Sequence, residues 1–132
     1  MTKDERVMRA MASRRDGYNC AQSLGFAFSD VTGLEDSVTA RALAGFGGGV
    51  GAQGEVCGVV SGMAFVAGMR GEGAPQEKGG VYRQVRDMTE MFRRKNGCIL
   101  CRELKSRERA VPCDELIRQG VEIMDDYYGE NA

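Results

Sequence analysis

The residues with the clearest chemical potential are the five cysteines, Cys20, Cys57, Cys98, Cys101 and Cys113. The chain contains no histidine, which excludes Ser-His and Cys-His catalytic pairs and mixed Cys/His metal sites. Any chemistry must therefore depend on thiols, carboxylates or a cofactor. A cysteine thiolate acts both as a nucleophile and as a metal ligand.

Four of the cysteines fall in or near the first turn of a predicted helix. They are Cys20 after the predicted N-cap Asn19, Cys57 after Gly54, Cys101 after Gly97, and Cys113 after Pro112. A helix N-terminus carries unpaired N–H groups and a partial positive charge, which favour thiolate over thiol. We expect these four sulfurs to converge on one site. The alternative is that each cysteine packs as a small buried hydrophobic residue.

Cys98 and Cys101 also form a C-x-x-C pair, with Cys113 twelve positions further on. This spacing resembles half of a metal knuckle, but a four-cysteine zinc ribbon has two such pairs. A thioredoxin-like pair would follow a strand in a βαβ unit, which the sequence does not predict. In a regular turn Cys98 would share a face with Cys101. Its role stays open, and we expect it to be dispensable.

The composition predicts one small globular domain spanning residues 1–132. With 42% hydrophobic and 28% charged residues, the chain is too apolar for disorder and too charged for a membrane protein. A net charge of -1 offers no general attraction for nucleic acid. The first residues lack the apolar stretch of a secretory signal, which predicts a cytoplasmic protein with free thiols.

Apolar residues recur with helical spacing outside a glycine-rich stretch, and no segment alternates with a strand period. We therefore predict an all-α fold, a compact bundle of about six or seven helices with a buried glycine-rich helix at its centre. The expected helices cover residues 3–15, 19–31, 35–46, 55–70, 75–95, 98–105 and 112–127. Asn19, with Gln22 three residues later, is typical of a helix N-terminus.

The central helix contains no charge from Val56 to Met69, and it is too short to cross a bilayer. Gly54, Gly58 and Gly62 share one of its faces, where the missing side chains allow close approach of another helix. We expect Gly58 and Gly62 to pack beside the cysteine site. The glycine face and the eight methionines fit a homodimer contact as well as an internal core.

The segment Gly49–Gly54 satisfies the dinucleotide-binding pattern G-x-G-x-x-G. That fingerprint requires a β-strand before its first glycine, and residues 41–46 are helix-forming instead. We interpret the segment as a flexible turn between helices.

Four elements occur in a recognisable order: Asn19-Cys20-Ala21-Gln22, then Cys57-Gly58-Val59-Val60-Ser61-Gly62, then Cys101-Arg102-Glu103-Leu104, then Pro112-Cys113. Over residues 17–127 the chain resembles the redox-active family named for its C, GCAxxG, C, C pattern. It departs from the pattern at Glu55-Val56 before the central cysteine, at Val59 where alanine is usual, and by the extra thiol Cys98. The resemblance implies a small helical protein of redox or electron-transfer chemistry.

Three hypotheses follow. In the first, Cys20, Cys57, Cys101 and Cys113 ligate iron or a [2Fe-2S] cluster that exchanges electrons with a redox partner protein. In the second, the same cysteines form a cofactor-free dithiol site that cycles a disulfide. In the third, the chain is a binding or structural protein whose cysteines only pack. Whether it is an oxidoreductase component stays open.

Overall fold

The computed structural model describes residues 1–106 and 110–130. Its helices, in chain order, are α1 (Lys3–Arg15), α2 (Cys20–Ala27), α3 (Ser29–Thr32), α4 (Asp36–Leu43), the 3₁₀-helix η1 (Ala44–Phe46), α5 (Gly58–Met69), η2 (Pro75–Glu77), α6 (Lys78–Asn96), α7 (Cys101–Ser106) and α8 (Cys113–Glu130). In this part of the chain the only β-pairing is an isolated antiparallel bridge between Val56 and Leu100. The all-α prediction is confirmed. The predicted domain, 1–132, includes residues 107–109 and 131–132, which lie outside the described residues.

The described residues form eight α-helices rather than six or seven, because one of the seven predicted helices is divided into two. The range 19–31 divides into α2 and α3 at Phe28, whose φ of -118° and ψ of 25° leave the helical region. The Val31 N–H donates to the Phe28 carbonyl at 2.9 Å, and the Ala27 carbonyl accepts from the Arg6 guanidinium at 2.8 Å. Arg6 therefore replaces a helical hydrogen bond at the break.

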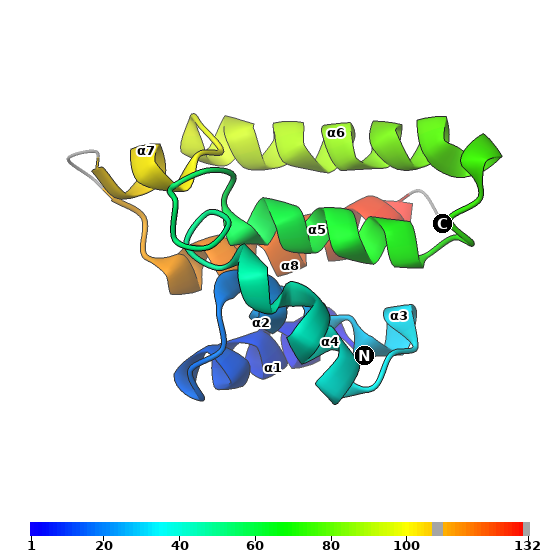
Figure 1. Cartoon of the computed structure of the whole chain (residues 1–132), viewed down its shortest axis with the longest axis horizontal. Helices are drawn as coiled ribbons and strands as arrows, with labels where there is room; N and C mark the ends of the chain where they lie inside the picture. The colour runs from blue at the N-terminus through cyan, green and yellow to red at the C-terminus, as the bar shows by residue number, and fades with distance from the viewer. Residues whose placement is uncertain (107–109, 131–132) are drawn as a thin grey trace.

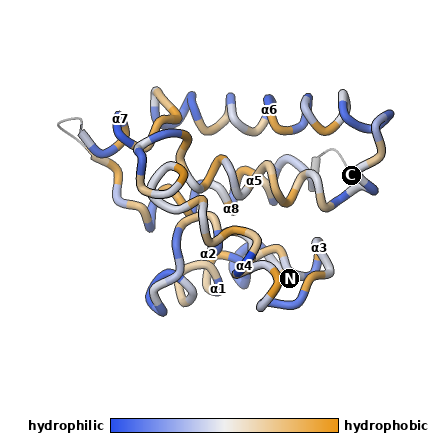
Figure 2. Tube along the Cα trace, in the orientation of Figure 1, coloured by the Kyte–Doolittle hydropathy of each residue, from blue (hydrophilic) through white to orange (hydrophobic). Residues whose placement is uncertain are grey.

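Helix α5 lies at the centre of the bundle, as predicted. Figure 1 shows it between α6 on one side and α2 and α4 on the other, with α8 behind it. Val59, Met63 and Val66 on α5 are at most 1% exposed. Figure 2 shows no strongly hydrophilic residue along α5, whereas hydrophilic residues follow the outer edge of α6. The helix begins at Gly58 rather than at residue 55, because Val56 pairs with Leu100.

The glycine face of α5 packs inside the molecule against α2. A Cβ atom on Gly62 would lie 2.8 Å from Leu24 Cδ2 and 3.3 Å from the Ala21 carbonyl oxygen. Gly54 does not belong to this face, since it lies before the helix at a φ of +74°. The close approach predicted at Gly58 and Gly62 is therefore an internal contact, and a homodimer would have to use another surface.

None of the described helices combines the length and the apolar character needed to cross a membrane.

Candidate functional site

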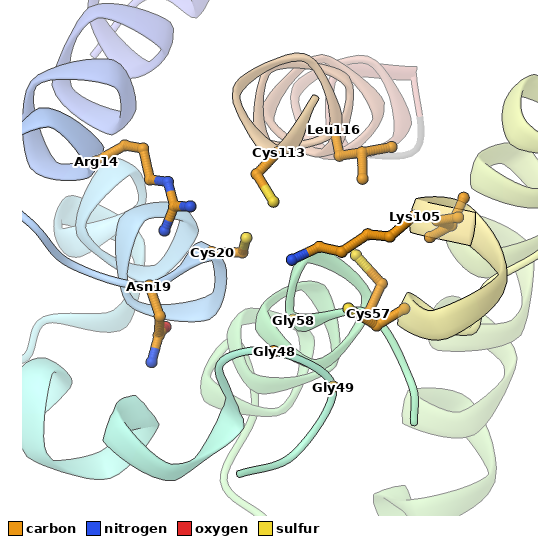
Figure 3. A pocket seen from close by; sticks show the side chains of 12 residues that line it. Arg14, Asn19, Cys20, Gly48, Gly49, Cys57, Gly58, Lys105, Cys113 and Leu116 are labelled. Carbon is orange, nitrogen blue, oxygen red and sulfur yellow. The ribbon is translucent and has the colours of Figure 1, made fainter. Parts of the chain in front are cut away.

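A cavity of about 50 Å³ lies where α2, α5, α7 and α8 begin. Its wall includes all four cysteines predicted to converge, and Figure 3 shows three of them, Cys20, Cys57 and Cys113, around a common space. The other residues in the wall are Arg14, Asn19, Gly48, Gly49, Gly58, Leu104, Lys105 and Leu116. Each of the four cysteines is either the first residue or the N-cap of a helix, as predicted.

Cys20 is positioned by the capping box predicted at the start of α2. The Asn19 side chain accepts a hydrogen bond from the Gln22 N–H at 2.8 Å, and the Gln22 side chain accepts one from the Asn19 N–H at 3.0 Å. The Asn19 amide nitrogen also donates to the carbonyls of Leu43 and Ala44 at 3.3 and 3.2 Å. The start of α2 is thereby attached to the end of α4.

Cys57 and Cys101 are held by the isolated bridge. The Cys57 N–H donates to the Ile99 carbonyl at 2.8 Å, and the Cys101 N–H donates to the Glu55 carbonyl at 2.7 Å. Successive side chains of an extended segment point to opposite faces. Cys57 and Cys101 each follow one residue of the Val56–Leu100 pair, so both point to the face opposite that pair. Both are buried, at 3% and 9% exposure.

Cys113, at the start of α8, faces Cys20 across the cavity (Figure 3), and each thiol is the largest influence on the pKa of the other. Cys113 is half-buried, whereas Cys20 is buried. The Cys20 thiol, followed by the positive charges of Lys105 and Arg14, lowers the pKa of Cys113 to about 6, against the opposing effects of burial and Asp114. Cys113 is therefore mainly a thiolate at neutral pH.

The expectation that helix starts favour thiolates fails at two of the cysteines. The Cys113 thiol, followed by burial, raises the pKa of Cys20. Burial raises the pKa of Cys57 to about 11, although the Val59 and Val60 backbones partly offset the rise. The free energy needed to remove a thiolate from water exceeds the stabilisation that it gains from the partial charge at a helix N-terminus. The pKa of Cys113 is lowered because this thiol is partly exposed, interacts with the Cys20 thiol and lies near two cations.

Cys98 does not line the cavity. It is half-buried, and its Sγ lies 3.9 Å from the Asn96 carbonyl oxygen. The regular turn that would have aligned Cys98 with Cys101 is absent, because Leu100 is drawn into the bridge with Val56 and α7 begins only at Cys101. The structure thus separates Cys98 from the other four thiols.

The G-x-G-x-x-G segment reaches the cavity through its first residue, Gly49, beside Gly48. It follows η1 rather than a strand, as expected for a turn, and its backbone is left-handed from residue 48 to 52, with φ between 58° and 75°. Val50 and Ala52 adopt these values without being glycine, which is uncommon for such residues. A Cβ on Gly49 would lie 2.5 Å from the Glu55 nitrogen and 2.8 Å from Cys101 Cβ. Gly49 therefore allows the turn to pack directly against Cys101.

Of the two glycines predicted beside the site, only Gly58 lines the cavity. A Cβ on Gly58 would lie 3.2 Å from Cys20 Cβ, from the Ala21 nitrogen and from the Phe46 carbonyl oxygen. Gly62 lies one turn further along α5 and contacts Leu24 instead. Gly62 therefore lies in the core one turn from the cavity, and a role for it in the site stays a prediction.

Sequence reasoning missed two cations of the cavity wall, Arg14 and Lys105. Both belong to charged stretches that are typical of solvated helix faces. No local pattern distinguishes them. They reach the site because the last turn of α1 and the whole of α7 lie beside the cysteines in the folded chain.

The donor set does not fit a metal ion as it stands. In residues 1–106 and 110–130, no three Cys, Asp or Glu side chains lie close enough together to hold one. The five cysteines are all free thiols. A site for iron or a [2Fe-2S] cluster needs three or four sulfurs converging on a common centre, so the iron hypothesis stays a prediction.

The fold and the cavity define a small all-helical protein whose distinctive chemical groups are clustered thiols. The chain belongs to the family described as "Putative redox-active protein (C_GCAxxG_C_C)", whose model matches residues 18–127. The resemblance in the sequence is thereby confirmed, and with it membership of a redox-active family. Comparison with curated proteins and with solved structures finds no match.

Proposed function

We propose that the protein is a thiol-disulfide redox protein in which Cys113 is the attacking thiolate and Cys20 is the resolving thiol. The observation that carries the proposal is that these two sulfurs face each other in one cavity (Figure 3), where each shifts the pKa of the other. Two sulfurs that face each other across a small cavity need only a limited movement to form a bond. The low pKa of Cys113 and its partial exposure are the properties of an attacking thiol.

In the proposed reaction, the Cys113 thiolate attacks one sulfur of a substrate disulfide. A mixed disulfide forms, and the other half of the substrate leaves as a thiolate. Cys20 then transfers its proton to that thiolate and attacks Cys113 Sγ, which releases the second half of the substrate as a thiolate. One proton from water converts this thiolate to a thiol, so the substrate disulfide is reduced to two thiols and Cys20 and Cys113 are oxidised to one disulfide.

Cys57 does not compete with Cys113 as a nucleophile. Its pKa of about 11 keeps it protonated at neutral pH, and it is 3% exposed. A buried thiol of this kind is unreactive toward external disulfides. It supports the wall of the cavity next to Cys101.

Peptide mapping after controlled oxidation tests the proposal. Reduced protein is treated with a small disulfide, blocked with N-ethylmaleimide and digested for mass spectrometry. We expect a Cys20–Cys113 disulfide in the parent, none in Cys113→Ser, and an accumulated mixed disulfide at Cys113 in Cys20→Ser. A parent protein that loses no thiols, or that pairs other cysteines instead, would contradict the assignment.

The iron or [2Fe-2S] hypothesis remains the second candidate, because four cysteines share one cavity. Anaerobic purification followed by iron and sulfide analysis tests it directly. Stoichiometric iron that is lost in both Cys57→Ser and Cys101→Ser would favour a metal centre over the dithiol.

A further inference from the structure

Among the described residues, the charged side chains that line the cysteine cavity are both positive. Of the residues that form its wall, Arg14 and Lys105 are cations, and none is a carboxylate. Figure 3 shows both side chains extending toward the sulfurs of Cys20 and Cys113, from opposite sides of the cavity. The whole chain has a net charge of -1, so this positive charge is local to the site.

The two cations differ in how far they are neutralised. Arg14 lies 3.8 Å from the Asp114 carboxylate and donates to the Tyr18 carbonyl at 3.1 Å. Lys105 has no carboxylate within ion-pair distance among residues 1–106 and 110–130. Within the described part of the chain, its ammonium group is therefore the less neutralised of the two cations beside Cys113.

The size of the cavity limits what can enter it. A volume of about 50 Å³ is enough for a few water molecules, since one needs about 10–15 Å³ of such space. The cavity therefore suits the disulfide of a small molecule rather than a large group. Negative groups on either side of that disulfide would then lie near Lys105 and Arg14.

We infer that the site is selective for small disulfides whose ends carry negative charge, and that Lys105 is the specificity-determining residue. The inference rests on the proposed dithiol function. Opposite charges at the mouth of a site raise the rate of encounter and orient the ligand. Lys105 would hold the anionic end while Cys113 Sγ reaches the disulfide.

Three disulfides with the same two-carbon spacing serve as probes: 3,3'-dithiodipropionate, which is a dianion, bis(2-hydroxyethyl) disulfide, which is neutral, and cystamine, which is a dication. The second-order rate constant for mixed-disulfide formation at Cys113 is measured with each probe in the Cys20→Ser background. The ratio of the dianion rate to the neutral rate is then compared between variants, so that the intrinsic reactivity of each probe cancels.

We expect Lys105→Met to lower the dianion-to-neutral ratio by about tenfold, and Lys105→Arg to restore it. The ratio for cystamine should move in the opposite direction, and added salt should weaken both effects. Lys78→Met is the matched control, because it removes one lysine charge at the opposite end of the bundle (Figure 1). Its ratio should equal that of the parent.

A dianion-to-neutral ratio that is the same in Lys105→Met as in the parent overturns the charge selectivity alone. A Cys113→Ser variant that reacts as fast as the parent overturns the dithiol function, and the selectivity with it. The two failures are therefore distinguishable in one set of measurements.

Discussion

Cys20 and Cys113 occupy the same position, the first residue of a helix, and yet they differ in acid–base behaviour. Cys113 is half-buried and lies near the charges of Lys105 and Arg14, whereas Cys20 is 8% exposed and its pKa is raised by Cys113 and by burial. The environment of each sulfur outweighs the effect of the helix end that they share. At the scale of single residues, this asymmetry is what gives one thiol the attacking role and the other the resolving role.

The rate of Cys113 alkylation should rise with pH through a midpoint near its pKa of about 6. Only the thiolate reacts, so the rate should level off near neutrality, whereas an ordinary thiol with a pKa of 9.0 would still be gaining reactivity. Cys20→Ala should move the midpoint upward, because the Cys20 thiol is the largest cause of the shift. Iodoacetamide labelling from about pH 4 to 9, read for each cysteine by mass spectrometry, measures this. A midpoint near 9 in the parent would contradict it.

Cys98→Ser should leave both stability and disulfide formation nearly unchanged. Cys98 lies outside the cavity, packs only at the edge of the core and has one weak hydrogen bond, to the Asn96 carbonyl. Substitutions of this kind change the free energy of unfolding by about 0.5 kcal/mol or less. Urea denaturation and the peptide map provide the measurements. If Cys98→Ser abolished the disulfide while Cys20→Ser retained it, the choice of site would be wrong.

The contact between α2 and α5 is the element-scale feature on which the site depends. Gly58 and Gly62 bring the two helices close together, and Gly58 does so directly beside Cys20. A methyl group at Gly58 would press on the backbone atoms of Ala21 and Phe46, which cannot rotate away. The short distance between α2 and α5 also places the start of α2 at the cavity.

Gly58→Ala and Gly62→Ala should each lower the free energy of unfolding. Overpacking costs about 1 to 3 kcal/mol, against the ~1 kcal/mol that alanine gains over glycine in helix propensity. Gly68→Ala is the control on the same helix: nothing lies within 4 Å of its added Cβ, so it should be as stable as the parent or more so. Thermal and urea melts of the three variants decide the question. If all three variants were equally stable, the α2–α5 interface would accommodate a methyl group without a loss in the free energy of unfolding.

Gly58→Ala should in addition change the reactivity of Cys113, whereas Gly62→Ala should not. Only Gly58 contacts Cys20, at 3.2 Å between the added Cβ and Cys20 Cβ. A shift of Cys20 would weaken its interaction with Cys113 and raise the alkylation midpoint. The labelling experiment described for Cys113 measures this in both variants.

At the scale of the whole molecule, Arg6 connects α1 to two distant parts of the chain. Its guanidinium donates to Asp30 at 2.7 and 3.1 Å, lies 3.5 Å from Asp125 on α8, and stacks over the Phe28 ring at 4.4 Å. The Arg6 side chain is 10% exposed. These contacts fix α1, and with it Arg14, relative to the rest of the bundle.

The Arg6–Asp30 pair should make stability depend on acid pH. Arg6 lowers the pKa of Asp30 from 3.8 to about 2, so the ionised carboxylate stabilises the folded state above about pH 4. That stabilisation is lost as the pH falls toward 2. Asp30→Asn should therefore be less stable than the parent at pH 6, and the difference should shrink between pH 4 and pH 2. Urea titrations at several pH values test it, and a difference that does not vary with pH would show that Asp30 acts through shape rather than charge.

Much of the fold could be predicted from local sequence. Helical periodicity gave the all-α class, Asn19 and Gln22 gave the capping box, and the helix-forming residues before Gly49 excluded a dinucleotide fold. These features depend on residues within one or two turns of each other, whose hydrogen bonds form in the same way in any helix. The breaks at Phe28 and before Gly58 could not be predicted, because Arg6 and Leu100 cause them from far along the chain.

The amino-acid sequence by itself determined which groups are present for chemistry: five thiols, no histidine, and four cysteines at helix starts. Only the tertiary structure decided how those thiols differ. It placed Cys20 and Cys113 in one cavity, and it brought Arg14 and Lys105 to the same cavity. Cys98 lies outside the cavity, because the Val56–Leu100 bridge prevents a regular turn between Cys98 and Cys101. The physical reason is that burial and electrostatic interactions depend on distances between separate elements, which packing sets and local spacing does not encode.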